Sequence, residues 1–218
     1  MKNNLSGQVK GYFQYKSAAF DSLYSENKNF FARFIDNNFR KDIRKRFIFA
    51  MREVGDVSGK TVLDVGCGPG KYCVALAKKG ALCVTGLDFS ENMIKLSQDL
   101  ARSRAVADVC KFIGQDFEKF ECKEKFDLVI AMGIFDYVAS PRQFLFKLKD
   151  ISNEKIIASF PRLTFFRSTQ RKIRYLFKGC PVFFYSKSKL ENLIRSCGLS
   201  KFSLTKLQGD WFVVMEVI

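Results

Sequence analysis

The segment Val62–Tyr72, VLDVGCGPGKY, constrains the fold of this chain more than any other part of the sequence. An apolar run carries Asp64 near its end, and glycine then occupies every second position from 66 to 70. Glycine-rich loops between a strand and a helix commonly hold phosphates. The dinucleotide pattern G-x-G-x-x-G and the P-loop would both require glycine at position 71, which is Lys71. The alternating spacing therefore differs from both common phosphate-binding loops.

A second acid, Asp88, ends the next predicted strand, 22 residues after Gly66. A carboxylate at this place can accept hydrogen bonds from both hydroxyls of a ribose. Acids at strand ends beside a glycine loop are costly to bury without a partner, and this applies to Asp64 as well as Asp88. The spacing and the two acids together predict a loop that binds a nucleoside without a pyrophosphate.

Strand and helix patterns alternate from Lys60 onward, which predicts an α/β fold with a doubly wound, mostly parallel, seven-stranded sheet. The last two strands are separated by residues 208–210 alone, too few for a parallel crossover, so they form a C-terminal antiparallel hairpin. The predicted strands are 61–65, 81–87, 106–113, 126–132, 155–159, 201–207 and 211–218, and the predicted helices are 71–79, 90–103, 141–151 and 187–197.

The N-terminal region precedes this alternation and shows helical spacing of its aromatic residues between Asn27 and Val54. We therefore expect an N-terminal helical extension or cap over residues 1–59. The α/β domain follows over residues 60–218, with an insertion around 160–189.

The formal net charge of +15 is distributed unevenly. Residues 1–60 carry 12 basic and 6 acidic side chains, residues 61–150 carry 13 and 12, and residues 151–218 carry 12 and 4. The glycine-loop region is thus nearly neutral, whereas both flanks are cationic. Such flanks attract nucleic acid, an anionic membrane surface or an acidic small molecule.

Several classes of site are excluded by composition. The chain has no histidine, so Ser-His-Asp and Cys-His catalysis and Cys/His zinc sites are ruled out. The seven cysteines show no C-x-x-C pair, and we expect reduced, mostly buried thiols and no metal site. No apolar run is long enough for a membrane span, and the first residues lack the apolar region of a signal peptide, which predicts a cytoplasmic protein.

Four motifs at consecutive strand ends resemble those of class I S-adenosylmethionine-dependent methyltransferases. They span about 70 residues and occur in the order of that family, whose sheet also carries an antiparallel strand. The overall run is most similar to small-molecule members, such as magnesium protoporphyrin and quinone-precursor methyltransferases. RNA-modifying members usually add an RNA-binding module or an N/D-P-P-[F/Y] signature, and neither is visible here. The motifs are VLDVGCGPG (62–70), VTGLDFSENM (84–93), GQDF (114–117) and FDLVIAM (126–132).

The resemblance implies S-adenosylmethionine as cofactor. The glycine loop would approach the methionine moiety, Asp64 would organise its amino group, and Asp88 would bind the ribose. Taken alone, Gly70 also fits a plain turn, and Met93 and Phe117 also fit a hydrophobic core. The implied cofactor residues are Asp64, Gly66, Cys67, Gly68, Gly70, Asp88, Phe89, Met93, Asp116, Phe117, Ala131 and Met132.

Asp136 and Tyr137 follow the fourth motif, where relatives commonly place groups that contact the methyl acceptor, often a histidine. Either residue can orient an acceptor, and Asp136 is also a candidate general base. The alternative is that Asp136 caps the helix that runs into Pro141.

A basic, aromatic segment lies between the fifth strand and the last helix. From Arg162 to Lys189 it contains eight basic residues and no acid, interleaved with aromatic residues. We predict that Arg171, Arg174, Tyr175 and Tyr185 hold a small anionic or amphiphilic acceptor, because arginine suits carboxylate or phosphate and aromatic rings suit a ring. The alternative is an amphipathic helix with a solvated basic face.

Three functions therefore remain open. The first is O- or N-methylation of a small acceptor by S-adenosylmethionine. The second is RNA methylation, with the basic flanks contacting phosphates. The third is a catalytically silent subunit that binds the cofactor.

Overall fold

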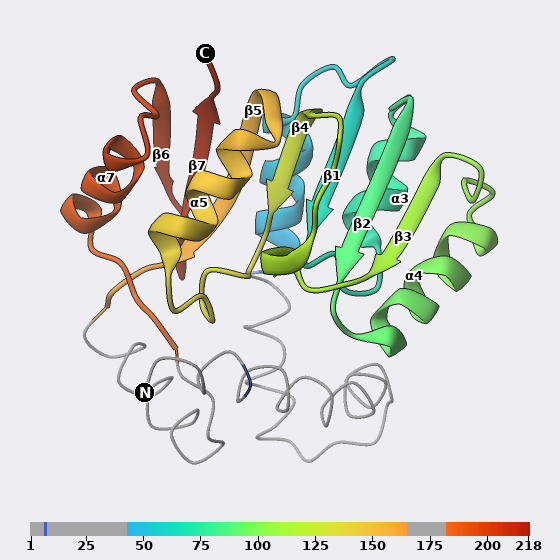
Figure 1. Cartoon of the computed structure of the whole chain (residues 1–218), viewed down its shortest axis with the longest axis horizontal. Helices are drawn as coiled ribbons and strands as arrows, with labels where there is room; N and C mark the ends of the chain where they lie inside the picture. Colours follow the sequence, from blue (N-terminus) through green and yellow to red (C-terminus); the bar gives the residue numbers. More distant parts are fainter. Residues whose placement is uncertain (1–6, 8–42, 165–181) are drawn as a thin grey trace.

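Seven strands form one mixed sheet with the order β3-β2-β1-β4-β5-β7-β6 (Figure 1). The computed structural model describes residue 7 and residues 43–164 and 182–218. Strands β1 to β5 pair in parallel, and β7 is antiparallel to both β5 and β6. The doubly wound sheet and its C-terminal hairpin confirm the predicted fold. The strands are β1 (Thr61–Val65), β2 (Cys83–Asp88), β3 (Cys110–Gly114), β4 (Phe126–Ala131), β5 (Ser152–Pro161), β6 (Phe202–Lys206) and β7 (Asp210–Glu216).

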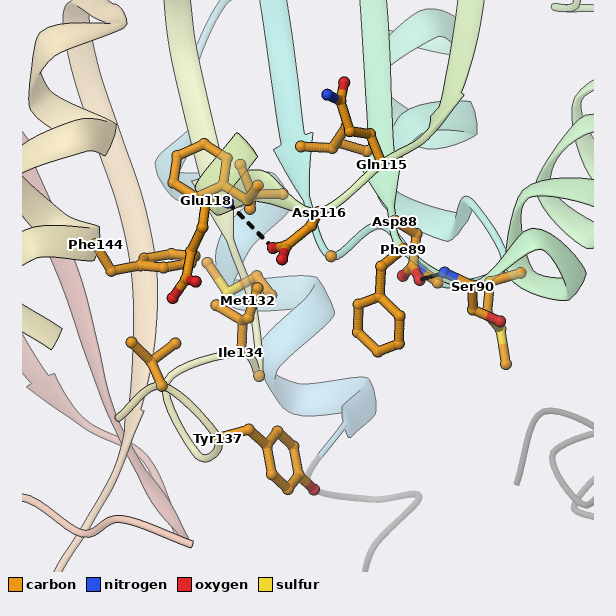
Figure 2. Close-up of a pocket in the computed structure, with 18 of the residues that line it drawn as sticks. Asp88, Phe89, Ser90, Gln115, Asp116, Glu118, Met132, Ile134, Tyr137 and Phe144 are labelled. Carbon is orange, nitrogen blue, oxygen red and sulfur yellow. Dashed lines mark hydrogen bonds between the residues drawn. The ribbon is translucent and has the colours of Figure 1, made fainter. Parts of the chain in front are cut away.

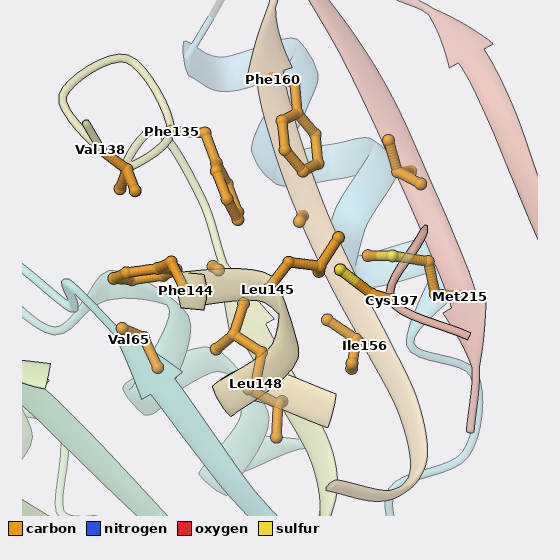
Figure 3. Close-up of a cluster of buried hydrophobic side chains, with 14 of the residues drawn as sticks. Val65, Phe135, Val138, Phe144, Leu145, Leu148, Ile156, Phe160, Cys197 and Met215 are labelled. Carbon is orange, nitrogen blue, oxygen red and sulfur yellow. The ribbon is translucent and has the colours of Figure 1, made fainter. Parts of the chain in front are cut away.

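Helices cover both faces of the sheet, which explains the continuous apolar runs of the central strands. Helices α5 and α7 pack on one face. Figure 3 shows Leu145 of α5 and Ile156 of β5 in the core there, which Ile194 of α7 also joins. Helix α3 and the helical residues 43–53 pack on the other face. These helical residues confirm the last part of the helical region predicted between Asn27 and Val54, whose residues 27–42 lie outside the described residues. No helix of the described residues is long and apolar enough to span a membrane. The helices are α3 (Lys71–Lys78), α4 (Glu91–Ser103), α5 (Pro141–Asp150) and α7 (Lys187–Ser196), with a 3₁₀ turn η2 (Phe117–Lys119).

Several strand boundaries differ from the predicted ones. Strand β2 begins at Cys83 rather than at position 81, and β3 begins at Cys110 rather than at Val106. The apolar residues before β3 form a turn, in which the Cys110 N–H donates to the Val106 carbonyl. Strand β5 is longer than predicted, because β7 pairs with it as far as Pro161 opposite Asp210.

The carboxyl ends of β1, β2, β3 and β4 meet at one edge of the sheet (Figure 1). From β1 the chain first builds the sheet outward through β2 and β3, and then returns to the other side of β1 with β4. The strand order therefore reverses between β1 and β4. In open α/β sheets, ligands bind in the crevice outside the strand ends at such a switch point.

Candidate functional site

A cavity of about 270 Å³ opens at this switch point (Figure 2). The glycine loop forms one side, the β2–α4 and β3–η2 connections form the next, and the β4–α5 loop closes the other side. The described lining contains three carboxylates and no lysine or arginine. Its residues are Val65, Gly66, Gly68, Pro69, Leu87, Asp88, Phe89, Ser90, Met93, Gln115, Asp116, Phe117, Glu118, Met132, Gly133, Ile134, Tyr137, Val138, Ala139 and Phe144.

The alternating glycines have a backbone reason. Gly66, Gly68 and Gly70 have φ values of 69°, 52° and 76°, in the left-handed region that other residues adopt at a cost. The N–H groups of Gly66 and Cys67 both donate to the Leu87 carbonyl, at 2.7 and 3.0 Å, and this attaches the loop to the end of β2. The loop therefore presents bare backbone to the cavity in a fixed position.

Asp88 connects the two loops that follow β1 and β2. Its Oδ2 accepts from the Gly68 N–H and its Oδ1 from the Ser90 N–H, each at 2.9 Å. Burial raises the pKa of Asp88, and the hydrogen bonds from Ser90 and Gly68 oppose that increase. Because each carboxylate oxygen has two lone pairs, Asp88 can still accept hydrogen bonds from two ligand hydroxyls.

Asp64 lies behind the glycine loop rather than in the cavity lining, and it is 1% exposed. Burial raises its pKa to about 7, the hydrogen bond from Cys73 lowers it, and the charge of Asp88 raises it further. The thiol of Cys73 donates to Asp64 Oδ2 at 3.4 Å. A buried carboxyl that titrates near neutrality is stabilised in its charged form by a nearby cation.

Apolar side chains form the walls on either side of Asp88 and Asp116. Phe89 and Met93 come from the β2–α4 region, and Phe117 follows β3. Asp116 is the N-cap of η2, and its side chain accepts from the Glu118 N–H at 3.1 Å. The lining thus combines apolar and aromatic side chains with the Asp116 carboxylate, a combination suited to an aromatic ring that bears an amino group.

Tyr137 lines the cavity, whereas its neighbour Asp136 is 6% exposed and lies outside the lining (Figure 2). The N-cap of α5 is Ser140, so the interpretation of Asp136 as the cap of this helix is wrong. The Asp136 carbonyl instead accepts from the Phe183 N–H at 2.9 Å. This bond attaches the returning end of the basic segment to the β4–α5 loop.

The structure brings most of the predicted cofactor residues together, but not all of the predicted residues line the cavity. Tyr185 is in the hydrophobic core at 1% exposure, with its ring 5.2 Å from that of Phe160. Its hydroxyl has no hydrogen-bond partner among the described residues. Arg171, Arg174 and Tyr175 lie outside the described residues. The predicted residues outside the cavity lining are Asp64, Cys67, Gly70, Ala131, Asp136 and Tyr185.

Sequence reasoning missed part of the lining. Gln115 belongs to the GQDF motif and could have been found there, but Glu118, Ile134 and Phe144 carry no local signal. The helical spacing around Phe144 predicts only a core residue, and its ring does pack on that of Phe117, with the ring centroids 4.6 Å apart. Phe144 reaches the cavity from α5, whereas Glu118 comes from η2 and Ile134 from the β4–α5 loop.

Comparisons with known proteins agree with this geometry. A family model described as a methyltransferase domain matches residues 56–174, which is more than half of the chain. The chain is 30% identical over 141 residues to cycloartenol-C-24-methyltransferase 1 of Oryza sativa subsp. japonica, covering 64% of this chain and 41% of that protein. It is 26% identical over 198 residues to the chloroplastic magnesium protoporphyrin IX methyltransferase of Arabidopsis thaliana, covering 84% of this chain and 62% of that protein. The chain therefore spans less than two thirds of either relative's length.

A solved structure shares the fold. The magnesium protoporphyrin IX methyltransferase from Synechocystis PCC 6803 with bound S-adenosylhomocysteine superposes with a TM-score of 0.78 at 22% identity. The match covers 98% of this chain and 100% of that one. The likeness therefore extends over the whole fold at low sequence identity.

Proposed function

Because the chain belongs to the class I S-adenosylmethionine-dependent methyltransferases, we propose that it methylates an oxygen or nitrogen of a small, anionic or amphiphilic acceptor. The observation that carries this proposal is the cavity at the switch point. There, an alternating-glycine loop and the Asp88 carboxylate are fixed to each other by a 2.9 Å hydrogen bond.

The residues of the cavity fit the cofactor of this family. Asp88 can accept hydrogen bonds from both ribose hydroxyls, and the aromatic rings of Phe89 and Phe117 in the lining suit adenine. Asp64 suits the α-ammonium group, because this fully buried carboxyl has a thiol as a hydrogen-bond donor and gains from a cationic partner. We infer that Met93 and Asp116 contact the adenine from its two edges.

The bound cofactor supplies an electrophilic methyl group on its sulfonium sulfur. The chain contributes by aligning the acceptor with that methyl group. In favourable reactions such positioning lowers the activation barrier by up to roughly 7–11 kcal/mol. We assign the orientation of the acceptor to Tyr137, on the β4–α5 loop, because this residue lines the cavity. Asp136 is a general-base candidate that would act where the acceptor keeps a proton until the transition state.

The charge of the acceptor is inferred from the distribution of basic residues. The described lining of the cavity holds Asp88, Asp116 and Glu118 and no cationic side chain, which suits a cationic cofactor. Residues 165–181 contain five basic residues and no acid. A purely solvated segment would mix both signs of charge. We therefore assign to Arg171 and Arg174 the binding of an anionic group of the acceptor.

The described residues on either side of that segment pair with each other, and one of them is bonded to the β4–α5 loop. Arg162 and Tyr185 form a parallel bridge, and the Phe183 N–H donates to the Asp136 carbonyl next to Tyr137. Tyr175 remains a predicted acceptor contact, whereas Tyr185 is packed in the core against Phe160. Relatives named for cycloartenol and magnesium protoporphyrin IX support an acceptor with an apolar ring body.

The test begins with cofactor binding. S-adenosylhomocysteine should bind and raise the melting temperature, since a ligand of the native state stabilises it by mass action. Asp88→Ala should weaken this binding strongly. Asp99→Ala is a matched control, because that exposed acid pairs with Arg102 on the outer side of α4. Equal loss in both variants, or tighter binding of NAD than of S-adenosylhomocysteine, contradicts the proposal.

The acceptor is then sought with labelled S-adenosylmethionine and a panel of ring compounds that carry carboxylate or phosphate groups. Transfer to a member of this panel supports the proposal. Transfer to RNA alone, with an affinity that falls steeply with salt across unrelated RNA sequences, supports the RNA methyltransferase instead. Cofactor binding without transfer to any candidate supports a silent subunit.

A further inference from the structure

A guanidinium from the N-terminal helix reaches the wall of the cavity from behind. Arg46 lies on the helical residues 43–53, before the matched family domain. Its Nη1 donates to Ser159 Oγ of β5 and to Asp210 Oδ2 of β7, each at 3.2 Å. The side chains of Arg46 and Asp210 are each 15% exposed, so this ion pair is largely shielded from solvent. The three residues lie far apart in the sequence and meet below the β4–α5 loop.

The network continues into the cavity wall through Ser159. Its hydroxyl oxygen also accepts from the Gly133 N–H at 2.8 Å, so Arg46 and Gly133 donate to the same atom. Ser159 is 1% exposed, and both lone pairs of its oxygen are used. The backbone of Gly133, with Met132 and Ile134 on either side, lines the cavity.

The guanidinium also packs directly on this turn. Gly133 has a φ of 73°, and a Cβ there would lie 3.1 Å from Arg46 Nη1. A side chain at position 133 would therefore both strain the backbone and displace the guanidinium. Gly133, Ser159 and Arg46 therefore form one network of contacts, which requires a residue without a side chain at position 133.

We propose that Arg46 is a positioning residue, which sets the Met132–Ile134 wall of the cavity by holding Ser159 as acceptor for the Gly133 N–H. This rests on the proposed function, in which Met132 of the same wall is a cofactor contact. The N-terminal helix is then a working part of the site rather than an appended cover.

The competing explanation is that the Arg46–Asp210 ion pair merely docks the helix on the sheet. Phe49, on the same helix, contacts Phe212 with ring centroids 4.8 Å apart and contributes docking of its own. The two explanations differ in which partner matters. Docking depends on Asp210, whereas positioning depends on Ser159.

The experiment measures amide hydrogen exchange at Gly133 and S-adenosylhomocysteine affinity in the full chain. Arg46→Met and Ser159→Ala should each speed exchange at Gly133 and weaken affinity by up to about tenfold, the effect of losing one buried hydrogen bond. The double variant should exchange no faster at Gly133 than Ser159→Ala alone, because Ser159→Ala already removes both the Arg46 contact and the acceptor of the Gly133 N–H. Arg44→Met, on the exposed side of the same helix, is the matched control and should alter neither quantity.

Asp210→Asn separates the two explanations, since it weakens the ion pair and leaves the Ser159 contact in place. Positioning predicts near-normal exchange at Gly133 in this variant. The proposal is overturned if Asp210→Asn reproduces Arg46→Met while Ser159→Ala does not, or if Arg46→Met leaves Gly133 exchange unchanged. Failure of the wild-type chain to bind S-adenosylhomocysteine would count against the proposed function, and the exchange measurements would still test the role of Arg46.

Discussion

The buried carboxyl of Asp64 should make cofactor binding depend on pH near neutrality. Burial raises its pKa to about 7, against the lowering effect of the Cys73 thiol and with a further increase from Asp88. Asp64 is therefore neutral below pH 7 and charged above it. If Asp64 organises the α-ammonium group of S-adenosylhomocysteine, as proposed above, its charged form attracts that group and binding should be tighter on the alkaline side.

The magnitude follows from the fraction of molecules that are ionised. With a pKa of about 7, roughly a tenth of Asp64 is charged at pH 6 and roughly nine tenths at pH 8, so the apparent affinity should change about tenfold. The ligand-free protein has the opposite trend. Because the folded pKa lies above the unfolded value of 3.8, the stability that the protonated carboxyl contributes is complete below pH 3.8 and is lost as the pH rises through 7. The loss is on the order of 4 kcal/mol.

The assay is calorimetric titration of S-adenosylhomocysteine at pH 6, 7 and 8. Asp64→Asn should bind more weakly at pH 8 and with no pH dependence in this window. Asp127→Asn is the control: a hydrogen bond from the Thr61 N–H lowers the pKa of Asp127, so that group titrates below the window. A wild-type affinity that is flat from pH 6 to 8, or the same slope in Asp64→Asn, refutes the reasoning.

Three further changes test other parts of the site. Asp136→Asn should lower kcat and flatten its pH dependence with cofactor affinity retained, if the carboxylate is a base; unchanged rates in steady-state assays would remove it from the chemistry. Arg171→Ala and Arg174→Ala should raise the acceptor KM and leave the cofactor Kd unchanged, and normal acceptor kinetics would make the segment a charged surface. Gly70→Ala should lose about 1–3 kcal/mol of unfolding free energy from backbone strain, because its φ is 76°. It should lose still more because the new Cβ would lie 2.7 Å from the Cβ of Ser97 on α4. Urea unfolding measures the loss, and Gly55→Ala is the control for this steric effect, because φ there is 69° and nothing lies within 4 Å.

Local signals were sufficient for the fold and for the central part of the site. Strand β1 and the loop after it were predictable because an apolar run followed by alternating glycines permits few conformations. Asp88 followed from its place at the next strand end, and the structure puts its carboxylate on the Gly68 N–H. The predicted start of β3 was wrong. Val106 looks like the first residue of a strand by its apolar side chain, but backbone hydrogen bonds hold residues 106–109 in a turn.

Long-range contacts account for what the sequence could not predict. Arg46 meets Ser159 across 113 residues and Asp210 across 164, and no spacing in the chain relates them. Cys73 is a reduced, buried thiol as expected, but the sequence did not predict that it donates to Asp64 from the first turn of α3. The length of β5 depended on its antiparallel partner, which lies beyond α7 in the sequence.

The acids of this chain line the cavity, whereas its excess of basic residues lies in the flanking segments, and this distribution affects how the proposed reaction would proceed. Methyl transfer from a sulfonium to an anionic atom removes a positive and a negative charge together, so a cation fixed on the reacting atom would stabilise the ground state more than the transition state. The carboxylates of the cavity and the absence of basic residues from its described lining avoid that arrangement. Basic residues that lie in the flanking segments can instead hold a remote anionic group of the acceptor, whose charge does not change. The acceptor would then gain binding energy from the flanks while its reacting atom meets the methyl group in a lining free of competing cations.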